Sequence, residues 1–151
     1  MIMSTSPQTE PTGASLPPVV LDTNVFVAAG FNRDSHAAAI VAAVRRGDLR
    51  MVWNDATRRE TAFILGRIPP LSGFVVDDLF RPDAHYTGPT HPQHFTRIAD
   101  PDDRKFIALA QATGAILISR DEHLLEPRDQ VDVTILTATE YYQRYLATMD
   151  E

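Results

Sequence analysis

Short apolar runs alternate with amphipathic stretches along the chain, and this alternation predicts the order of its elements. Apolar runs predict buried strands over residues 19–21, 50–53, 115–119 and 131–136. Apolar positions at helical spacing predict helices over residues 36–46, 54–65, 100–113 and 137–149, with shorter helices over 72–80 and 121–125. Strands that alternate with helices favour an α/β domain with a mainly parallel sheet.

Polar residues, glycine and proline indicate where these elements begin and end. Ser35 is placed to cap the helix that follows it, and Gly47 and Gly114 are placed to end helices. Residues 22–34 are interpreted as a turn region. Residues 81–98 hold three prolines and three histidines, and we interpret them as a loop.

The length of 151 residues corresponds to one domain. Residues 1–18 hold four prolines and are predicted to form a disordered tail, with a single domain over residues 19–148. The absence of cysteine excludes disulfides and thiolate zinc sites. There is no long uncharged apolar run and no signal-peptide pattern, so we expect a cytoplasmic protein without a membrane partner.

Acidic residues outnumber basic ones by 20 to 14, which at first argues against nucleic acid as a partner. The positions of the acids change this view. Asp22 and Asp121 each follow an apolar strand, and the carboxyl ends of parallel strands meet at one edge of a sheet. We therefore expect the two carboxylates to converge, although capping of the next helix explains either one alone.

A third acid, Glu60, lies on a predicted helix. It shares a stripe with Ala56, Phe63 and Ile64, which indicates that its carboxylate lies on the inward face. A buried carboxylate needs a partner or a metal. The structural alternative is an ion pair with an arginine, and the two arginines next to Glu60 in sequence do not lie on that face.

Three further aspartates open the helix predicted over residues 100–113. Capping explains Asp100 well, because a proline follows it and acids favour the first turn of a helix. Asp103 is the best candidate for chemistry, since it shares a face with Phe106 and Ile107. Asp102 points about a quarter turn away and is the second candidate.

Four carboxylates in one pocket, Asp22, Glu60, Asp103 and Asp121, repel one another unless a cation neutralises them. Oxygen ligands select hard ions, so the pattern indicates Mg²⁺ or Mn²⁺. Such an ion activates water and stabilises charge on phosphorus oxygens, which suits phosphodiester hydrolysis. Without these four acids, 16 acidic residues face 14 basic ones, so most of the acidic excess belongs to the predicted pocket.

The motifs resemble those of PIN-domain ribonucleases. Residues 19–25, Val-Val-Leu-Asp-Thr-Asn-Val, resemble the opening strand of the family with its Asp-Thr-Asn signature. Glu60 with Leu65 resembles the second motif, residues 100–110 the third, and residues 118–121, Ile-Ser-Arg-Asp, the fourth, with serine where threonine is more usual. The order and spacing agree over about three quarters of the chain.

This resemblance implies a three-layer α/β/α fold and cleavage of single-stranded RNA with Mg²⁺ or Mn²⁺. It also implies a toxin role in a toxin–antitoxin pair, with an antitoxin protein as a possible partner. The acidic site carried over from the family is Asp22, Glu60, Asp103 and Asp121, with Thr23, Asn24 and Ser119 as supporting polar groups.

Basic residues lie beside these positions in sequence and are candidates for contacts with the RNA backbone: Arg58, Arg59, Arg104, Lys105 and Arg120. Their helix faces differ, so not all of them can serve. In the loop, His85, His91 and His94 suggest a metal site, but no fourth soft ligand accompanies them. Solvated histidines are the preferred interpretation.

The last predicted helix carries Tyr141, Tyr142 and Tyr145, and either Thr137 or Thr139 can cap it. The tyrosines can stack on bases. We favour packing of this helix onto the sheet or onto a second subunit, and we expect a homodimer.

Two other functions are compatible with the acids. In an aspartyl-phosphate phosphotransfer enzyme Asp22 would be the nucleophile, but Asn24 stands where such sites carry a second aspartate. A non-catalytic PIN-like binding module is the other alternative, and the presence of all four acids argues against it.

Overall fold

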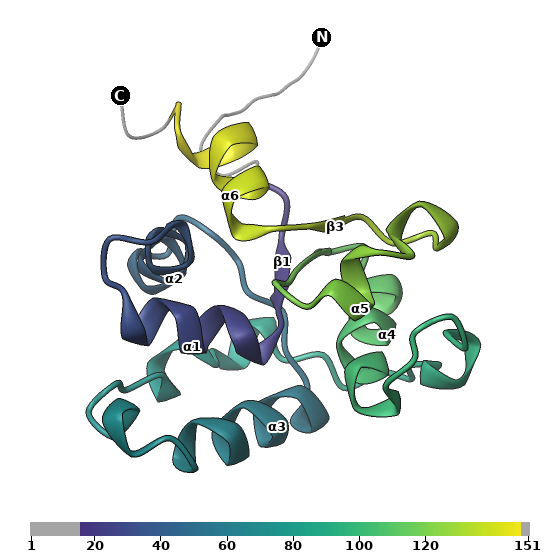
Figure 1. Ribbon diagram of the computed structural model, residues 1–151, viewed down its shortest axis with the longest axis horizontal. Coiled ribbons are helices and arrows are strands. Elements are labelled where there is room, and N and C mark those ends of the chain that lie inside the picture. The colour runs from purple at the N-terminus through teal and green to yellow at the C-terminus, as the bar shows by residue number, and fades with distance from the viewer. Residues whose placement is uncertain (1–15, 149–151) are drawn as a thin grey trace, which may run out of the picture.

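A small parallel sheet lies at the centre of the structure, a computed structural model in which residues 16–148 are described (Figure 1). Its strands are β1 (Val19–Leu21), β2 (Ile116–Ile118) and β3 (Ile135–Leu136), in the order β1-β2-β3. In this register Leu21 lies opposite Ile118. The carboxyl ends of β1 and β2 therefore meet at one edge of the sheet.

Helices cover both faces of this sheet: α1 (Thr23–Phe31), α2 (His36–Arg46), α3 (Asp55–Gly66), α4 (Arg104–Thr113), α5 (Glu122–Leu125) and α6 (Ala138–Tyr141). Side chains alternate between the faces of each strand. Val19 and Leu21 pack into a core with α1, α2 and α6, whereas Val20 packs with Leu117 and α4 in a second core. In Figure 1, α1 and α2 lie on one side of β1 and α4 on the other. The α/β class and the three layers are confirmed.

Predicted helix ends agree with the structure. The Ser35 side chain accepts a hydrogen bond from the Ala38 N–H at the start of α2. Gly47 and Gly114 end α2 and α4 with φ of 89° and 73°, a left-handed conformation that favours glycine. Thr137, not Thr139, caps α6.

The interpretation of residues 22–34 as a turn region was wrong, because Thr23–Phe31 form α1. This helix is apolar on nearly every side, so it shows no helical stripe in the sequence. Its buried residues include Val25, Phe26 and Ala29, while its last residue, Phe31, is exposed. A helix enclosed by other elements does not need a polar face.

Several other elements are shorter than predicted. Residues 50–53 make only isolated bridges, Met51 to Val19 and Trp53 to His85, and the strand over 131–136 shortens to β3. Residues 72–80 contain a 3₁₀ turn, Asp77–Leu79, in place of an α-helix. The helix predicted from residue 100 begins as the 3₁₀ turn Pro101–Asp103, and the loop over 81–98 contains two more such turns.

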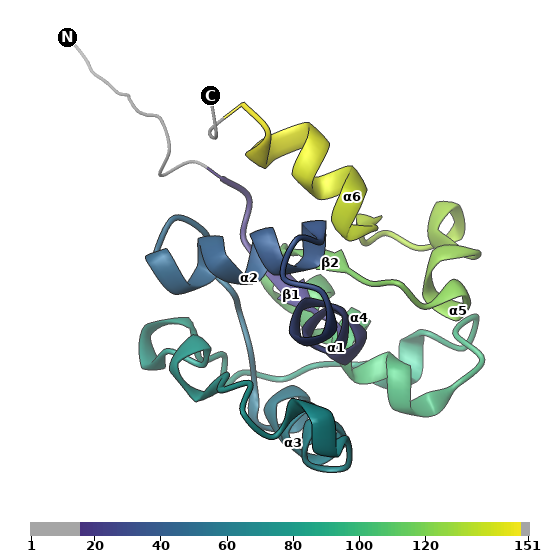
Figure 2. The same ribbon diagram turned by 60° about the vertical axis from the view of Figure 1, so that its left-hand side comes forward.

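The two ends of the described chain lie close together. The Tyr141 hydroxyl donates a hydrogen bond to the Pro17 carbonyl oxygen at 2.9 Å. After Tyr141 the chain continues as a π-helical turn, Tyr142–Leu146, and this last helical segment lies beside α2 (Figure 2). Most of the predicted tail, residues 1–15, and Met149 lie outside the described residues. Within residues 16–148, no helix combines the length and the apolar character that crossing a membrane requires.

Candidate functional site

The serine at the end of β2 joins the two strand-end acids. Its hydroxyl, Ser119 Oγ, donates to Asp22 Oδ2 at 2.7 Å and accepts from the Asp121 N–H at 2.9 Å. Ser119 is fully buried, so neither hydrogen bond exchanges readily with water. The parallel pairing of β1 and β2 thus brings together two aspartates that are 99 positions apart in sequence.

Asp22 is unusually buried for a carboxylic acid, with 4% of its surface exposed. It occupies the N-cap position of α1, but its side chain makes no capping hydrogen bond. Burial and the negative charge of Asp121 raise the pKa of Asp22, the Ser119 hydrogen bond and the amides of Thr23 and Asn24 lower it, and the net value is about 6. Burial next to Asp121, beyond what helix capping needs, marks Asp22 as a candidate site residue.

Asp103 lies at the N-cap of α4, close to Asp121. Among residues 16–148, Asp103 Oδ2 is buried without any hydrogen-bond partner. Burial, a hydrogen bond to Asp121 and the charges of neighbouring acids together raise the pKa of Asp103 to about 7. A buried oxygen with no donor is costly unless a cation or an ordered water satisfies it.

A histidine that the sequence interpretation missed completes this cluster. Asp103, Asp121 and His123 each offer one ligand atom, and these three atoms lie within 4.8 Å of one another. Asp121 caps α5 by accepting a hydrogen bond from the His123 N–H. The same residue therefore caps a helix and belongs to the candidate metal-binding cluster. The signal was the position of His123, two residues after Asp121 in the first turn of the helix.

These residues fit a divalent cation. The donor set is rich in carboxylate oxygen, which suits Mg²⁺ or Mn²⁺, and the unpaired Asp103 Oδ2 is an acceptor without a donor. A cation there neutralises charges that otherwise repel. The cluster of Asp103, Asp121 and His123 can therefore bind a metal.

Glu60 is not part of this cluster in the described residues and forms an ion pair instead. Lys105 Nζ donates to Glu60 Oε1 at 3.0 Å, and each side chain is about one quarter exposed. The partner is thus a lysine from α4, where the sequence suggested an arginine. The predicted inward stripe was wrong, because the buried residues of α3 are Thr57, Thr61 and Leu65, and Phe63 is 57% exposed.

The predicted supporting residues differ in their surroundings. Buried Thr23 shares a hydrogen bond of 2.9 Å with Thr61, which joins the first turn of α1 to α3. Asn24 is exposed. Asp100 accepts from the Asp102 N–H at 3.0 Å and both are exposed, so the capping interpretation of Asp100 is confirmed.

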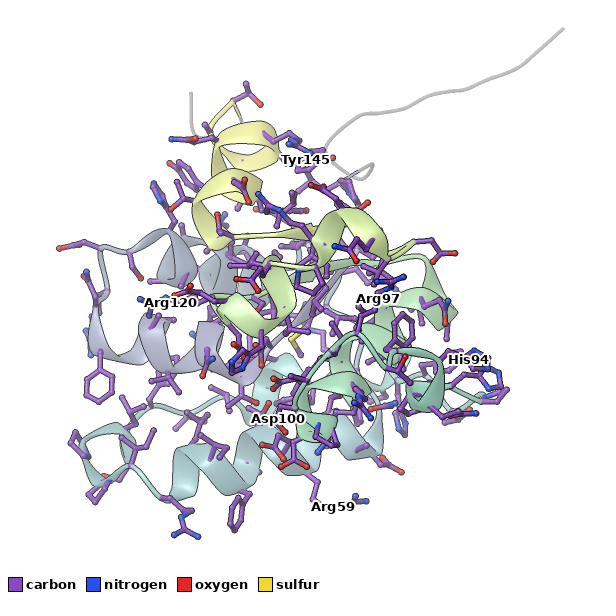
Figure 3. The ribbon with its side chains drawn as sticks, turned by 45° about the vertical axis from the view of Figure 1, so that its right-hand side comes forward. Arg59, His94, Arg97, Asp100, Arg120 and Tyr145 are labelled. Atoms are coloured by element: carbon purple, nitrogen blue, oxygen red, sulfur yellow. The ribbon has the colours of Figure 1, made fainter. Side chains whose placement is uncertain are left out.

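The five basic candidates divide into engaged and free side chains. The Arg58 guanidinium lies over the rings of Trp53 and Phe80, Arg104 donates to the Ile98 carbonyl, and Lys105 pairs with Glu60. Arg59 and Arg120 are exposed and make no hydrogen bond, ion pair or ring contact within the described part of the chain. In the view of Figure 3, these two arginines lie to either side of Asp100.

The loop histidines have structural contacts. His85 stacks on Trp53 with ring centroids 4.0 Å apart, and His91 stacks on His94. Within residues 16–148 they form no group able to hold a metal.

The tyrosines of the last helix also have packing roles. Tyr141 is fully buried, and Tyr142 and Tyr145 pack against the core that contains α2. The tyrosines therefore attach the last helix to the domain, as the preferred interpretation had it.

A three-layer α/β domain with a cluster of acids near the carboxyl ends of its strands belongs to the class of candidate metal-binding domains. A family model described as the PIN domain matches residues 18–123, and the chain belongs to the PIN-domain family. PIN domains are generally nucleases that act on RNA with divalent metals.

A solved structure, the crystal structure of PAE2754 from Pyrobaculum aerophilum, has the same fold with a TM-score of 0.53. The two sequences are 16% identical, and the match covers 89% of this chain and 93% of the other. No curated protein matches the sequence.

Proposed function

We propose that this protein is a metal-dependent endoribonuclease that cleaves single-stranded RNA with water activated by Mg²⁺ or Mn²⁺. The observation that carries the proposal is Asp103 Oδ2, a buried oxygen without a partner that faces the carboxylates of Asp121 and Asp22. Such an arrangement is unfavourable in a protein that binds no cation.

A divalent cation held there would supply a water of lowered pKa and would stabilise negative charge on the attacked phosphate. We propose that Asp22, Asp103 and Asp121 hold it directly or through its waters, with Glu60 completing the acidic site. Ser119 fixes the orientation of Asp22 and the backbone of Asp121. Asp103, with its free oxygen, orients the attacking water and accepts its proton. His123 adds a donor at the exposed side of the cluster.

The ion pair of Glu60 gives Lys105 a defined place in this proposal. The side chain of Lys105 neutralises Glu60 and holds an ammonium group close to the start of α4, where it could contact an RNA phosphate. Thr23 supports the same region by joining α1 to α3. Asn24, exposed on the first turn of α1, and Arg59 are free to contact the substrate.

The biological role that fits the family resemblance is a cytoplasmic toxin of a type II toxin–antitoxin pair, acting as a homodimer. The test is controlled expression of the chain in a bacterial host. We expect growth arrest that requires Asp22 and is relieved when the neighbouring gene product is expressed with it. Normal growth at high expression of active nuclease contradicts the toxin role.

The biochemical test incubates the purified chain with single-stranded RNA in Mn²⁺, in Mg²⁺ and in EDTA. We expect cleavage only with metal and products without a 2′,3′-cyclic phosphate, because water and not the 2′-hydroxyl attacks. Asp22→Asn is the inactive variant and Asp129→Asn, at an exposed position outside the pocket, is its control. A phosphatase substrate run in parallel tests phosphotransfer. Cleavage in EDTA, or equal activity of Asp22→Asn, overturns the proposal.

A further inference from the structure

We propose that a groove along α1 holds the RNA strand next to the cleaved phosphate, with Arg120 on a backbone phosphate and Phe31 stacked on a base. This inference rests on the proposed nuclease function and extends it, because it names residues that determine how the substrate lies.

The groove has a volume of about 650 Å³ and runs between α1 and the turn that leads into α6. Val27, Ala28 and Phe31 form its α1 wall, and Thr137 and Thr139 lie on the other side. Its walls are partly apolar and partly polar. A groove of this character accommodates a nucleotide, whose base has apolar faces and whose sugar and phosphate need polar neighbours.

Two segments that line the groove, α1 and Arg120, are next to candidate site residues in the sequence. Asp22 immediately precedes α1, and the nine residues of this helix span about 13 Å. Phe31 lies at the far end of that distance. Arg120 also lines the groove, and it stands in sequence between Ser119, which binds Asp22, and Asp121. A strand whose phosphate occupies the acidic pocket can therefore continue along α1.

Arg120 is a free cation at the position where this strand enters. Other arginines of the surface are already paired, among them Arg45 with Asp78 and Arg128 with Glu140. Arg120 is exposed and has no such partner among the described residues. Arginine binds phosphate through parallel N–H donors. Asp34 lines the far part of the groove near Phe31, so we place the phosphate at Arg120 and the base at the other end.

Phe31 is an aromatic ring that no neighbouring ring or cation covers. Its surface is 58% exposed, and it makes no ring contact within the described chain. Phe63 is exposed to the same extent, but the Arg67 guanidinium lies over its ring at 5.1 Å. A phenylalanine ring exposed at the edge of a groove is suited to stack on a nucleobase.

RNA is favoured over a protein segment as the occupant because the free cation is adjacent in sequence to two site residues. A peptide needs no such continuity with the acidic pocket. The polar wall formed by Thr137 and Thr139 also suits a sugar and phosphate backbone.

The experiment measures kcat and KM for cleavage of a single-stranded RNA with Mn²⁺ by Phe31→Ala and Arg120→Ala. The matched controls are Phe63→Ala, which removes a covered ring of equal exposure, and Arg144→Ala, which removes a free arginine of the last helix. We expect KM to rise about tenfold in each groove variant, with kcat within about twofold of the parent, and no change in the controls. Phe31→Trp, which keeps an aromatic ring, should have the KM of the parent.

A second measurement separates the two contacts. Binding of a fluorescent oligonucleotide to Asp22→Asn protein is followed as salt rises. Removal of Arg120 should reduce the slope of log affinity against log salt by about 0.7, the value for one phosphate contact on a single strand, whereas Phe31→Ala should leave the slope unchanged.

The outcomes distinguish this inference from the proposed function. If the parent protein does not cleave RNA, the proposed function fails. If the parent cleaves and both groove variants match their controls in KM and in binding, only the groove assignment is overturned, and the groove is left to a protein segment. A rise in KM for the groove variants alone supports RNA in the groove.

Discussion

One hydroxyl group links the two strand-end carboxylates, and its role is visible at the scale of single residues. Ser119 Oγ contacts Asp22 Oδ2 and the Asp121 N–H, and both contacts lie in the interior. A residue of this kind does not touch the substrate, but it fixes the groups that do. Outer-shell partners of metal ligands typically account for about 10–100-fold in metal affinity.

Ser119→Ala should therefore weaken metal binding by about 10–100-fold and lower the free energy of unfolding by about 1–3 kcal/mol, because the Asp121 N–H and Asp22 lose a partner. Isothermal titration with Mn²⁺ and urea unfolding measure the two effects. Ser72→Ala, at an exposed position, is the control and should change neither. Unaltered metal affinity in Ser119→Ala contradicts the bridging role.

Asp22→Asn should reduce RNA cleavage by at least about 100-fold while raising the melting temperature of the metal-free protein by a few degrees at pH 8. The reason is that a neutral amide replaces a carboxylate that burial disfavours. Added Mn²⁺ should raise the melting temperature of the parent more than that of the variant. Asp48→Asn breaks only a surface ion pair with Arg46 and serves as the control. A loss of folding in Asp22→Asn would show that the residue is structural.

At the scale of elements, α1 connects the acidic pocket with the proposed RNA groove. Its first turn follows Asp22, its middle packs through Phe26 and Ala29 into the core, and its last residue is Phe31. Gly30 allows the end of this helix to approach residues 71–74 closely. A Cβ at Gly30 would lie 2.8 Å from side-chain carbons of both Leu71 and Phe74.

Gly30→Ala should lower the free energy of unfolding by about 1 kcal/mol, because crowding against Leu71 and Phe74 exceeds the gain in helix propensity. Gly66→Ala is the matched control. It lies in α3 with nothing within 4 Å of the added Cβ, so it should gain about 0.5–1 kcal/mol. Urea unfolding of the two variants measures the difference, and equal stability contradicts the close packing at Gly30.

The same helix shows where prediction from sequence ends. Elements with polar faces, such as α2 and α4, were predicted well because burial on one side imposes a helical period. The helix α1 has no such period, because apolar residues occupy its half-buried positions as well as its buried ones. In the site, the convergence of Asp22 and Asp121 followed from the parallel sheet. Two features of the site depend on packing between helices, which spacing in sequence does not specify. They are the pairing of Glu60 with Lys105 and the membership of His123 in the cluster with Asp103 and Asp121.

At the scale of the whole molecule, burial of acids gives the metal-free protein a specific dependence on pH. Asp22 and Asp103 have pKa values of about 6 and about 7, above the value of about 3.9 for aspartate in an unfolded chain. Between about pH 4 and pH 7 the folded state therefore binds more protons than the unfolded state. The free energy of unfolding must fall as pH rises through this range.

In EDTA we expect the protein to be less stable at pH 8 than at pH 5, with Asp22 alone contributing on the order of 1 kcal/mol to this difference. Glu140 does not reverse the trend, because its pKa is lowered to about 2 by Arg128 and its contribution is lost only below about pH 4.5. Mn²⁺ binds the deprotonated carboxylates, so it should stabilise most at pH 8 and flatten the profile. Urea unfolding from pH 5 to 8, with and without Mn²⁺, measures both effects. Asp22→Asn should show a shallower slope in EDTA, and stability that rises with pH in the metal-free parent contradicts a buried acidic pocket.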